Sequence, residues 1–462
     1  MSDWQSAGVY AWQHGMQAFL LLGLVLALWL LTDLLRQRRA PQATASWALL
    51  LIFLPWVGLL IYLLIGVRRV PRQSQRERRL QLDCCAERPK EDASEFDRFL
   101  RRLGIPGAST GNALHLHVDS HAARNALLGV ITGARKRLCV GVYILEDDEH
   151  GQGVVEALIE RAQAGVAIYL LVDAVGSSRL SRKARDALHA AGVQFSEFLP
   201  VWKALWRRVA NLRNHRKLVV ADARHVWTGG RNIARHYLSR RGWDDLSFDV
   251  IGPAAADLER VFRQSWRFAT GVELPEPESC AQSDGASTVQ WVPSGPDLEH
   301  DVLHAALLHL IYTAQRRLWF ISPYFVPDEA LQTALLTATR SGVDVRILVP
   351  HRSDNALVDL VRSGYLRELQ AVGAKVFRYV PRMLHSKAWI ADNIAAVGSA
   401  NLDCRSLMLN FEVMGFFERD LDVAAVVQHF NTCCERSKRG IRAVGLWRET
   451  WAGALRLLAP LL

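Results

Sequence analysis

The sequence predicts an α/β fold that is built twice, with parallel or mixed sheets flanked by helices and preceded by two transmembrane helices. Three observations support this prediction. Two charge-free apolar stretches lie near the N-terminus, strands alternate with helices through the rest of the chain, and two nearly identical motifs occupy matching places in that part. The two halves are therefore expected to form a pseudo-dimer.

The apolar stretches at residues 15–32 and 47–67 contain no Asp, Glu, Lys or Arg. About 20 apolar residues are enough for a helix to cross a bilayer. A cleaved signal peptide is the competing interpretation of the first stretch, but no basic segment precedes it and no small-residue cleavage site follows before Asp33. A buried hairpin of a soluble protein is the other alternative. Residues 1–70 are thus expected to form a two-helix membrane anchor.

Arginines follow both stretches, and they favour different orientations. Three lie between the stretches and six follow the second: Arg36, Arg38 and Arg39, then Arg68, Arg69, Arg72, Arg76, Arg78 and Arg79. Two spanning helices would place these clusters on opposite sides of the membrane, whereas basic residues prefer the cytoplasm. The larger cluster, together with seven cysteines that show no C-x-x-C spacing and are expected to be reduced, favours a multi-pass protein with a cytoplasmic body.

The remaining chain repeats on a large scale. ARKRLCVGVYIL from Ala134 and GVAIYLLVDAVGS from Gly165 correspond to AQRRLWFISPYFV from Ala314 and GVDVRILVPHRS from Gly342. Apolar strands that alternate with helices indicate a sheet covered on both faces. We expect a charged juxtamembrane linker over residues 71–110, a first half over 111–274, a joint over 275–287, and a second half with a C-terminal helix over 288–462.

Each half carries a histidine and a lysine two residues apart. His215 and Lys217 lie in HRKLVVAD, and His385 and Lys387 lie in HSKAWIAD. Side chains two apart on a strand point to the same face, so each imidazole is expected to share a pocket with an ammonium group.

An aspartate follows each lysine by five residues, at Asp222 and Asp392. On a regular strand this spacing turns the carboxylate to the opposite face from the histidine and lysine. We therefore expect these aspartates to brace the hairpin rather than to contact a substrate.

The segments that follow the motifs are also alike. GGRN contains Asn232, and GSAN contains Ser399 and Asn401, whose polar groups are able to donate to phosphate oxygens. Asp245 and Glu412 follow at similar distances, and either carboxylate could orient a histidine through its Nδ1. Metal binding is the other interpretation of the histidines, but the adjacent lysines oppose a cation, and no metal or other cofactor is predicted.

The paired motifs resemble those of the phospholipase D superfamily, and within it they are most similar to bacterial cardiolipin synthases. The resemblance is carried by NLRNHRKLVV, WTGGRNIA, YFVPDEAL, RYVPRMLHSKAWIADN and GSANLDCRSLMLNFEV, and by the apolar N-terminal stretches and the closing LRLLAPLL. Two departures stand out. ADAR follows the first motif where the family more often has Asp-Gly, and residues 202–213 are rich in Trp and Arg; this run is able to lie in the membrane interface.

The resemblance implies a fold of two phospholipase D-like repeats and a set of site residues. The catalytic motif residues are His215, Lys217, Asp222, His385, Lys387 and Asp392, and the phosphate-binding or orienting residues are Asn232, Asn401, Ser399, Asp245 and Glu412. It also implies that His215 is the nucleophile and His385 the acid/base, in a phosphatidyl transfer between two phosphatidylglycerol molecules that yields cardiolipin and glycerol.

The resemblance further implies a protein of the bacterial inner membrane that acts on phospholipids, with phosphatidylethanolamine as an alternative donor. The net charge of +10 favours anionic partners without choosing among them. No nucleic-acid partner is expected, and the sequence does not predict protein partners. Two alternatives stay open: a phospholipase D-type phosphodiesterase that hydrolyses phospholipid or nucleic acid, and an inactive scaffold that binds anionic lipid.

Overall fold

The computed structural model describes residues 2–36, 41–66, 93–200, 211–276, 285–298, 300–442 and 445. The chain divides into two compact units. We call the described residues 2–36 and 41–66 the anchor unit, and the described residues from 93 to 442, except Asn211, the α/β unit. The Trp/Arg run at 201–210, the charged segment 67–92 and the expected C-terminal helix at 446–462 lie outside the described residues.

The anchor unit contains α1 (Ser2–Arg36), α2 (Pro41–Phe53) and α3 (Pro55–Ile65). Among the described residues one helical segment, Trp12–Arg36, is long and apolar enough to cross a membrane. The second predicted spanning helix is not confirmed, because Pro55 divides it. Proline lacks an N–H and clashes with the preceding turn, so the helix ends before it, and Leu54 leaves helical geometry with φ −132° and ψ 64°.

The α/β unit begins earlier than the sequence indicated, because part of the predicted linker is folded. Helix α5 (Glu95–Arg102) is capped by Ser94, whose hydroxyl accepts from the N–H of Asp97, and it buries Phe96 and Leu100. Its Asp97 also accepts a hydrogen bond from Gln290 at 2.8 Å, on a strand of the second half. The charged residues here belong to an amphipathic helix, and the charge density of this segment is compatible with either a linker or a surface helix.

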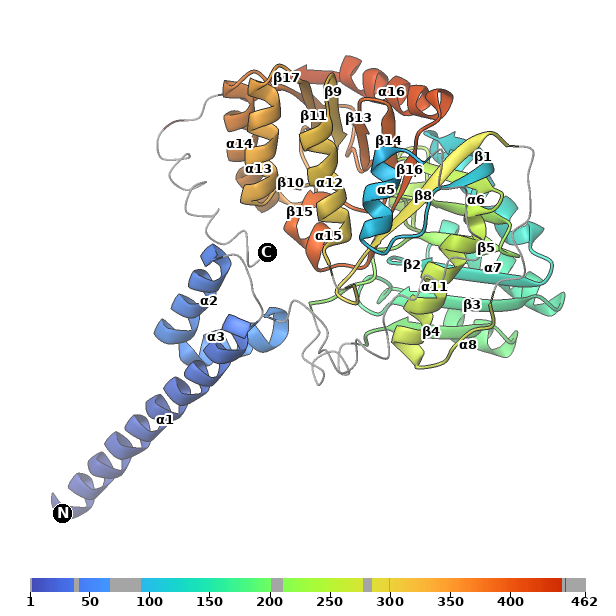
Figure 1. The fold of residues 1–462 in the computed structure, drawn as a ribbon. Coiled ribbons are helices and arrows are strands. Elements are labelled where there is room, and N and C mark those ends of the chain that lie inside the picture. The colour runs from blue at the N-terminus through green and yellow to red at the C-terminus, as the bar shows by residue number, and fades with distance from the viewer. Residues whose placement is uncertain are drawn as a thin grey trace. The chain divides into compact units, whose positions relative to one another are not determined.

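Both halves contribute strands and helices in the same order (Figure 1). The first half provides β1 (Ser109–His117), α6 (Ser120–Gly133), β2 (Arg137–Val142), α7 (Glu149–Gln163), β3 (Ala167–Asp173), α8 (Arg182–Ala190), β4 (Gln194–Phe198), β5 (Leu218–Ala221), β6 (His225–Gly229), α10 (Arg235–Leu238), β7 (Ser247–Ile251) and α11 (Ala254–Thr270). The second half provides β8 (Ser287–Ser294), α12 (Val302–Thr313), β9 (Arg317–Ile321), β10 (Phe325–Val326), α13 (Glu329–Arg340), β11 (Asp344–Pro350), α14 (Ala356–Ala371), β12 (Lys375–Tyr379), β13 (Ala388–Ala391), β14 (Ile394–Gly398), β15 (Leu402–Asp403), α15 (Cys404–Met408), β16 (Glu412–Phe417), α16 (Asp420–Glu435) and β17 (Ser437–Arg439).

Fifteen of the strands in the described residues form one continuous sheet whose order is β17-β12-β11-β9-β13-β14-β16-β8-β1-β7-β6-β5-β2-β3-β4, and the short strands β10 and β15 pair with each other. From the centre of the sheet outward, corresponding strands of the two halves follow in the same order, and the second half adds β17 at its outer edge. The halves meet where β1 pairs antiparallel with β8. Figure 1 shows these two strands side by side. The predicted pseudo-dimer is therefore one sheet shared by both halves.

Each half of this sheet is mixed rather than parallel. The outer strands β2, β3 and β4 run parallel, as do β9, β11 and β12. The motif-bearing strands β5 and β13 pair antiparallel with the strands that follow them, β6 and β14. A connection of two or three residues joins only antiparallel neighbours, so the short turn after each motif excludes a parallel arrangement there.

The apolar runs predicted as strands form the core of each half. In the first half, β2 and β3 bury Leu138, Val140, Leu170 and Val172 against the apolar faces of α6 and α7. A strand covered on both faces is expected to be apolar along most of its length, as β2 is after Arg137 and as β3 is before Asp173. Among the described residues, Cys139, Cys404, Cys433 and Cys434 form no disulfide bond.

Asp222 and Asp392 lie in the turns that follow β5 and β13. Each carboxylate accepts hydrogen bonds from three consecutive backbone N–H groups at the start of the neighbouring strand: Arg135, Lys136 and Arg137 for Asp222, and Gln315, Arg316 and Arg317 for Asp392, all at 2.7–2.9 Å. Both aspartates thus hold a hairpin turn against the first residues of the neighbouring strand, β2 or β9. The structure places them at the other end of the strand from the histidine and lysine.

The turn at Asp222 contains one departure from the family pattern, Ala223 in ADAR, where the family more often has glycine. Ala223 has φ 51°, in the left-handed region that glycine adopts without strain. A side chain in this region costs roughly 1–2 kcal/mol. The alanine of ADAR therefore strains the turn without changing its path.

We predict that Ala223→Gly raises the free energy of unfolding by about 1 kcal/mol, because it removes this strain. Chemical denaturation of the purified protein measures the change. Ala221→Gly, on the preceding strand where φ is ordinary, is the matched control and should lower stability instead. A loss of stability in Ala223→Gly as large as in the control would contradict the prediction.

Candidate active site

The two His-x-Lys motifs are brought together by backbone contacts between the halves. The segment at Asn214 bridges to Phe411, and the segment at Leu384 bridges to Asp244. The N–H of His215 donates to the carbonyl of Phe411 at 2.9 Å, and the N–H of His385 donates to that of Asp244 at 2.6 Å. Each histidine is therefore held beside the acidic segment of the opposite half.

The histidines and lysines lie just before β5 and β13, in extended backbone, rather than within the strands. Each histidine still lies beside its own lysine, as the sequence predicted, although neither residue is part of the strand. Lys217 Nζ donates to the carbonyl of His215 at 2.7 Å, and Lys387 Nζ lies 2.7 Å from Nδ1 and 3.0 Å from Nε2 of the His385 ring. Both lysines are nearly fully buried, at 1% and 2% exposure.

The carboxylates pair with the histidines crosswise. Nδ1 of His385 lies 2.6 Å from Oδ2 of Asp245, and Nδ1 of His215 lies 3.6 Å from Oε1 of Glu412. Sequence left open which carboxylate would serve which histidine, and in the structure each half supplies the partner for the other. Because Nδ1 faces the carboxylate, Nε2 of each ring is the nitrogen that does not pair with it, and Nε2 of His385 has Lys387 Nζ at 3.0 Å.

Burial and positive charge lower the pKa of both imidazoles and so favour their neutral forms. Burial lowers the pKa of His385 to about 4, with Lys387 adding to the effect, while Asp245 opposes it. Burial lowers the pKa of His215 well below its usual value, and Lys217, Arg405 and Lys387 lower it further. Lysines from both halves act on His215, so the two motifs share one electrostatic environment.

The two carboxylates differ in protonation. Burial raises the pKa of Glu412 to about 7, although Lys217 opposes the shift. Burial also acts to raise the pKa of Asp245, but His385 and Lys387 outweigh it and hold that pKa well below its usual range. Near neutral pH His385 therefore faces a full negative charge, whereas His215 faces a carboxyl group that is partly protonated.

The lysines are also shifted. Burial lowers the pKa of Lys387 to about 7 and lowers that of Lys217, although Asp245 and Glu412 favour the charged forms. An anion that enters this site would favour the charged form of both lysines, because it supplies a nearby negative charge.

Small residues allow the carboxylates to approach. A side chain on Gly230 would place its Cβ 2.2 Å from Oδ1 of Asp245. The matching position in the second half is Ser399, whose hydroxyl accepts from the N–H of Val413 at 3.0 Å and donates to its carbonyl at 3.3 Å. The Gly-small pattern thus serves the packing of the acidic segment against the motif.

The two asparagines already have partners in the protein. Oδ1 of Asn232 accepts from the N–H of Ile144 at 3.2 Å, and Nδ2 of Asn401 donates to Oγ of Ser406 at 3.3 Å. Oδ1 of Asn401 is buried with no hydrogen-bond partner among the described residues. The structure places both amides in the loops after β6 and β14; a role in phosphate binding is not tested by it.

Sequence reasoning missed several groups of this site. Tyr143 stacks on His215 with ring centroids 3.9 Å apart, and Tyr237 and Trp243 lie 5.2 and 5.3 Å from His385. Arg405 lies near enough to lower the pKa of His215. A signal existed for Tyr143, because tyrosine follows β2 in VGVYIL and β9 in ISPYFV. Nothing in the sequence marked Arg405 or Tyr237.

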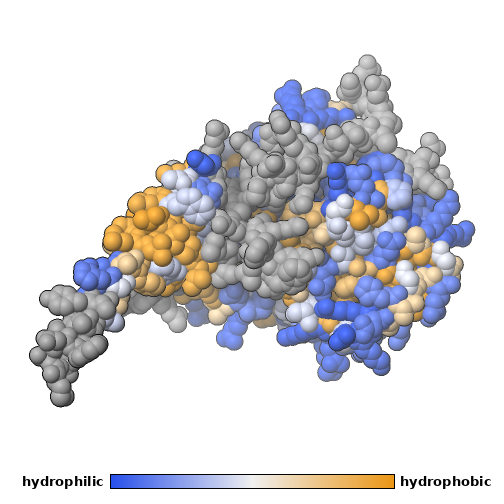
Figure 2. Space-filling view, turned by 90° about the horizontal axis from the view of Figure 1, so that it is seen from below, coloured by the Kyte–Doolittle hydropathy of each residue, from blue (hydrophilic) through white to orange (hydrophobic). Residues whose placement is uncertain are grey.

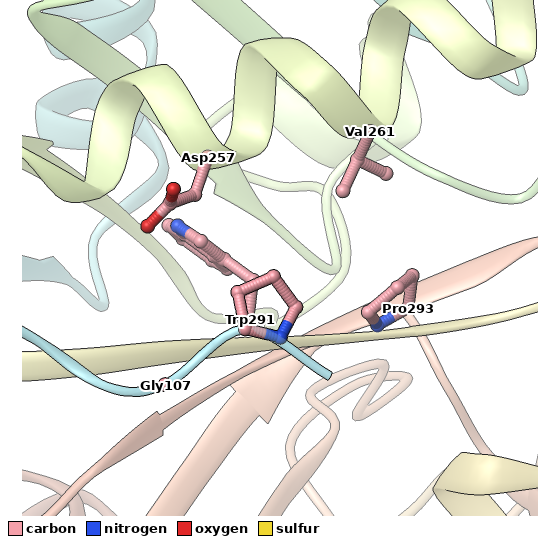
Figure 3. A pocket seen from close by; sticks show the side chains of 6 residues that line it. Gly107, Asp257, Val261, Trp291 and Pro293 are labelled. Carbon is pink, nitrogen blue, oxygen red and sulfur yellow. The ribbon is translucent and has the colours of Figure 1, made fainter. Parts of the chain in front are cut away.

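A small cavity elsewhere in the unit is unrelated to this cluster (Figure 3). It is lined by Pro106, Gly107, Asp257, Val261, Trp291 and Pro293, none of which belongs to a motif. Its free volume of about 10 Å³ holds no more than one water molecule.

Known proteins match this chain over most of its length. Residues 127–266 and 307–434 match the family described as cardiolipin synthase, PLD-like domain, and residues 25–66 match the one described as phospholipase D-nuclease N-terminal. Cardiolipin synthase A of Pseudomonas syringae is 34% identical over 452 residues, covering 92% of this chain and 94% of its own. Cardiolipin synthase A of Pseudomonas aeruginosa is 37% identical over 398 residues, covering 81% of each chain.

A solved structure supports the fold. The crystal structure of phosphatidylserine synthase from Haemophilus influenzae superposes with a TM-score of 0.60 at 14% identity, and it covers 80% of this chain and 100% of its own. At that identity the likeness concerns the arrangement of two α/β halves and not the chemistry.

We predict that Asp245→Asn destabilises the protein by about 3–5 kcal/mol at pH 6, because it leaves buried positive charge without a counter-ion. The pKa of Lys387 is lowered to about 7, so its ammonium is present below that pH and lost above it. The loss of stability should therefore be smaller at pH 9. Denaturation curves at both pH values measure it.

Glu412→Gln is the matched control for this prediction. The pKa of Glu412 is already raised to about 7, so at pH 6 its neutral isostere should cost much less than Asp245→Asn. Equal costs for the two substitutions at pH 6 would show that the carboxylates do not differ in charge.

Proposed function

The chain belongs to the cardiolipin synthase family of phospholipase D-like proteins, and we propose that it makes cardiolipin and glycerol from two phosphatidylglycerol molecules by phosphatidyl transfer. The observation that carries the proposal is the crossed cluster, in which two buried imidazoles each have an ammonium and a carboxyl group beside them. Such a cluster suits a double displacement at phosphorus.

In the first step His215 attacks phosphorus through Nε2. Its low pKa keeps the ring neutral with a free lone pair, and its partner Glu412 carries too little charge near neutral pH to favour an imidazolium. The bond from phosphorus to the glycerol oxygen breaks as the bond to nitrogen forms. The product is a phosphatidyl-histidine on His215.

His385 serves as the acid and then the base. The ionised carboxylate of Asp245 at 2.6 Å stabilises the imidazolium form of His385. A bound phosphodiester offsets the lysine charges and raises the pKa of His385, so the ring is able to protonate the departing glycerol. It then removes the proton of the acceptor hydroxyl, whose oxygen attacks phosphorus and releases His215.

The remaining polar groups stabilise the negative charge that the five-coordinate transition state places on the non-bridging oxygens. Lys217 and Lys387 supply positive charge, and Asn232, Asn401 and Ser399 are proposed to donate hydrogen bonds once the substrate has displaced their present contacts. Because the site is buried, these interactions are stronger than they would be in water.

The substrates and location follow from the same proposal. The helix Trp12–Arg36 would hold the enzyme in the cell membrane, where phospholipid substrates reside. The α/β unit is proposed to be cytoplasmic. Phosphatidylethanolamine remains an alternative donor, and the described site contains no feature that selects the donor headgroup.

The full chain, purified in detergent and returned to phosphatidylglycerol vesicles, tests the proposal. We expect cardiolipin and glycerol in equal amounts by mass spectrometry, and loss of at least about 10³-fold in rate for His215→Ala and for His385→Ala. Phosphatidate in place of cardiolipin would indicate hydrolysis. Cleavage of single-stranded DNA without a lipid product would indicate a nuclease, and wild-type activity in either variant would exclude the mechanism.

We further predict which histidine becomes phosphatidylated. A phosphatidyl ester of p-nitrophenol needs no proton for its leaving group, so His385→Ala should still form the covalent intermediate and accumulate it. His215→Ala should form none. Mass spectrometry of the quenched protein detects the added phosphatidyl group. Label on His385 in the His215→Ala variant would reverse the assignment.

A further inference from the structure

The arginines that flank the anchor conflict with a two-span topology. Arg36, Arg38 and Arg39 follow α1, and six more arginines follow Gly66. Two complete crossings would leave one cluster outside the cytoplasm, although basic residues next to spanning helices are strongly biased to the cytoplasmic side. The described part of the anchor unit differs from two spanning helices.

Helices α2 and α3 form a tight hairpin. The chain leaves helical geometry at Leu54, immediately before Pro55. Beyond the break, a Cβ on Gly58 would lie 2.9 Å from the carbonyl oxygen of Leu50 and 3.1 Å from the Cα of Leu51. In a straight helix residues eight apart are separated by about 12 Å along the axis. The backbone of α3 therefore turns back onto the end of α2.

Neither arm of the hairpin is long enough to cross a bilayer. α2 has 13 residues and α3 has 11. At 1.5 Å per residue these arms reach about 20 Å and 16 Å, against a hydrocarbon core of about 30 Å. The segment Trp12–Arg36, by contrast, has 25 residues and reaches about 37 Å.

Contacts with α1 fix the depth at which the hairpin turns. Trp56, just beyond the break, stacks on Phe19 with ring centroids 4.3 Å apart. A Cβ on Gly23 would lie 2.9 Å from its Nε1. The tip thus lies beside the middle of α1, about 20–25 Å along the helix from Arg36.

Contacts near the other end show where the hairpin returns. Tyr62, one turn before the end of α3, donates its hydroxyl to Asp33 of α1 at 2.7 Å. The same ring packs edge-on against Trp47 of α2 with centroids 5.3 Å apart. The chain therefore leaves α3 at the end of α1 that carries Arg36, which is the end where it entered α2.

The outer surface of the hairpin is suited to lipid acyl chains. Residues 41–66 contain no Asp, Glu, Lys or Arg. The side chains exposed on the hairpin include Leu49, Ile52, Phe53, Leu54, Val57 and Leu60, each 47–75% exposed. On the face that Figure 2 shows, the described part of the anchor unit is mainly orange, whereas blue, hydrophilic residues are frequent on the α/β unit. The occupant that fits is the hydrocarbon of one membrane leaflet.

We propose that α1 crosses the membrane once and that α2 and α3 form a re-entrant hairpin, which enters and leaves the bilayer at the face where α1 ends. Both arginine clusters then lie on the cytoplasmic side, and the N-terminal end of α1 lies on the opposite side. The proposal does not depend on the reaction that the α/β unit catalyses.

Labelling of single cysteines in intact cells tests this topology. In a chain whose native cysteines are replaced by serine, Ser6→Cys, Gln37→Cys and Gln73→Cys are treated with a membrane-impermeant maleimide. We expect Ser6→Cys to be labelled from outside, and Gln37→Cys and Gln73→Cys only after the cells are opened. Positions 37 and 73 on opposite sides would overturn the hairpin, and positions 6 and 37 on one side would overturn the single crossing.

A second measurement uses the chain with its native cysteines, in case the cysteine-free form does not fold. An epitope tag at the N-terminus should be removed by protease added to right-side-out vesicles, while an epitope inserted after Gln37 or after Gln73 is protected. The two-span topology requires tags at the N-terminus and after Gln73 to behave alike. That result would overturn the proposal.

A double variant tests whether Pro55 and Gly58 are what makes this segment a hairpin rather than one spanning helix. Pro55→Leu combined with Gly58→Leu removes the break and the close approach, and should give a continuous helix of about 25 residues that crosses the membrane. Positions 37 and 73 should then lie on opposite sides. Gly15→Leu, at a position in α1 with open space around it, is the matched control and should leave the labelling pattern unchanged. A double variant that labels as the wild type does would contradict the role given to Pro55 and Gly58.

Discussion

The crossed pairing of each imidazole with the carboxyl group of the other half is the constraint on which the rest of this structure depends. His385 needs Asp245, and His215 needs Glu412. Neither half alone could bury two lysines and two histidines without the counter-charge that the other half supplies. The shared sheet and its bridges at Asn214 and Asp244 exist in the one arrangement that satisfies both pairs at once.

The halves are alike in topology and different in chemistry. Glycine beside Asp245 and serine beside Glu412 fit a short carboxylate in one half and a longer one in the other. The short one stays ionised at 2.6 Å from its histidine, and the longer one approaches neutrality at 3.6 Å. A duplicated fold thus provides two imidazoles that face carboxyl groups of different pKa.

Much of the fold followed from local pattern, and the exceptions have physical reasons. Apolar strands alternating with helices gave two repeated halves, because burial on both faces of a sheet leaves a continuous apolar run. Hydropathy could not separate one long helix from two short ones, since both are apolar throughout and the break depends on Pro55. The many charged residues likewise made α5 hard to recognise from the sequence, because few of its residues, among them Phe96 and Leu100, are apolar and buried.

The sequence by itself determined the duplicated motifs, the pairing of each histidine with its lysine, and the bracing aspartates, because these depend on residues a few positions apart. Only the tertiary structure decided which carboxylate serves which histidine, which of the two stays ionised, and which tyrosines contact the rings. Those properties come from groups about 70 to 200 positions apart and from burial, which sets a pKa and is not written in the order of residues.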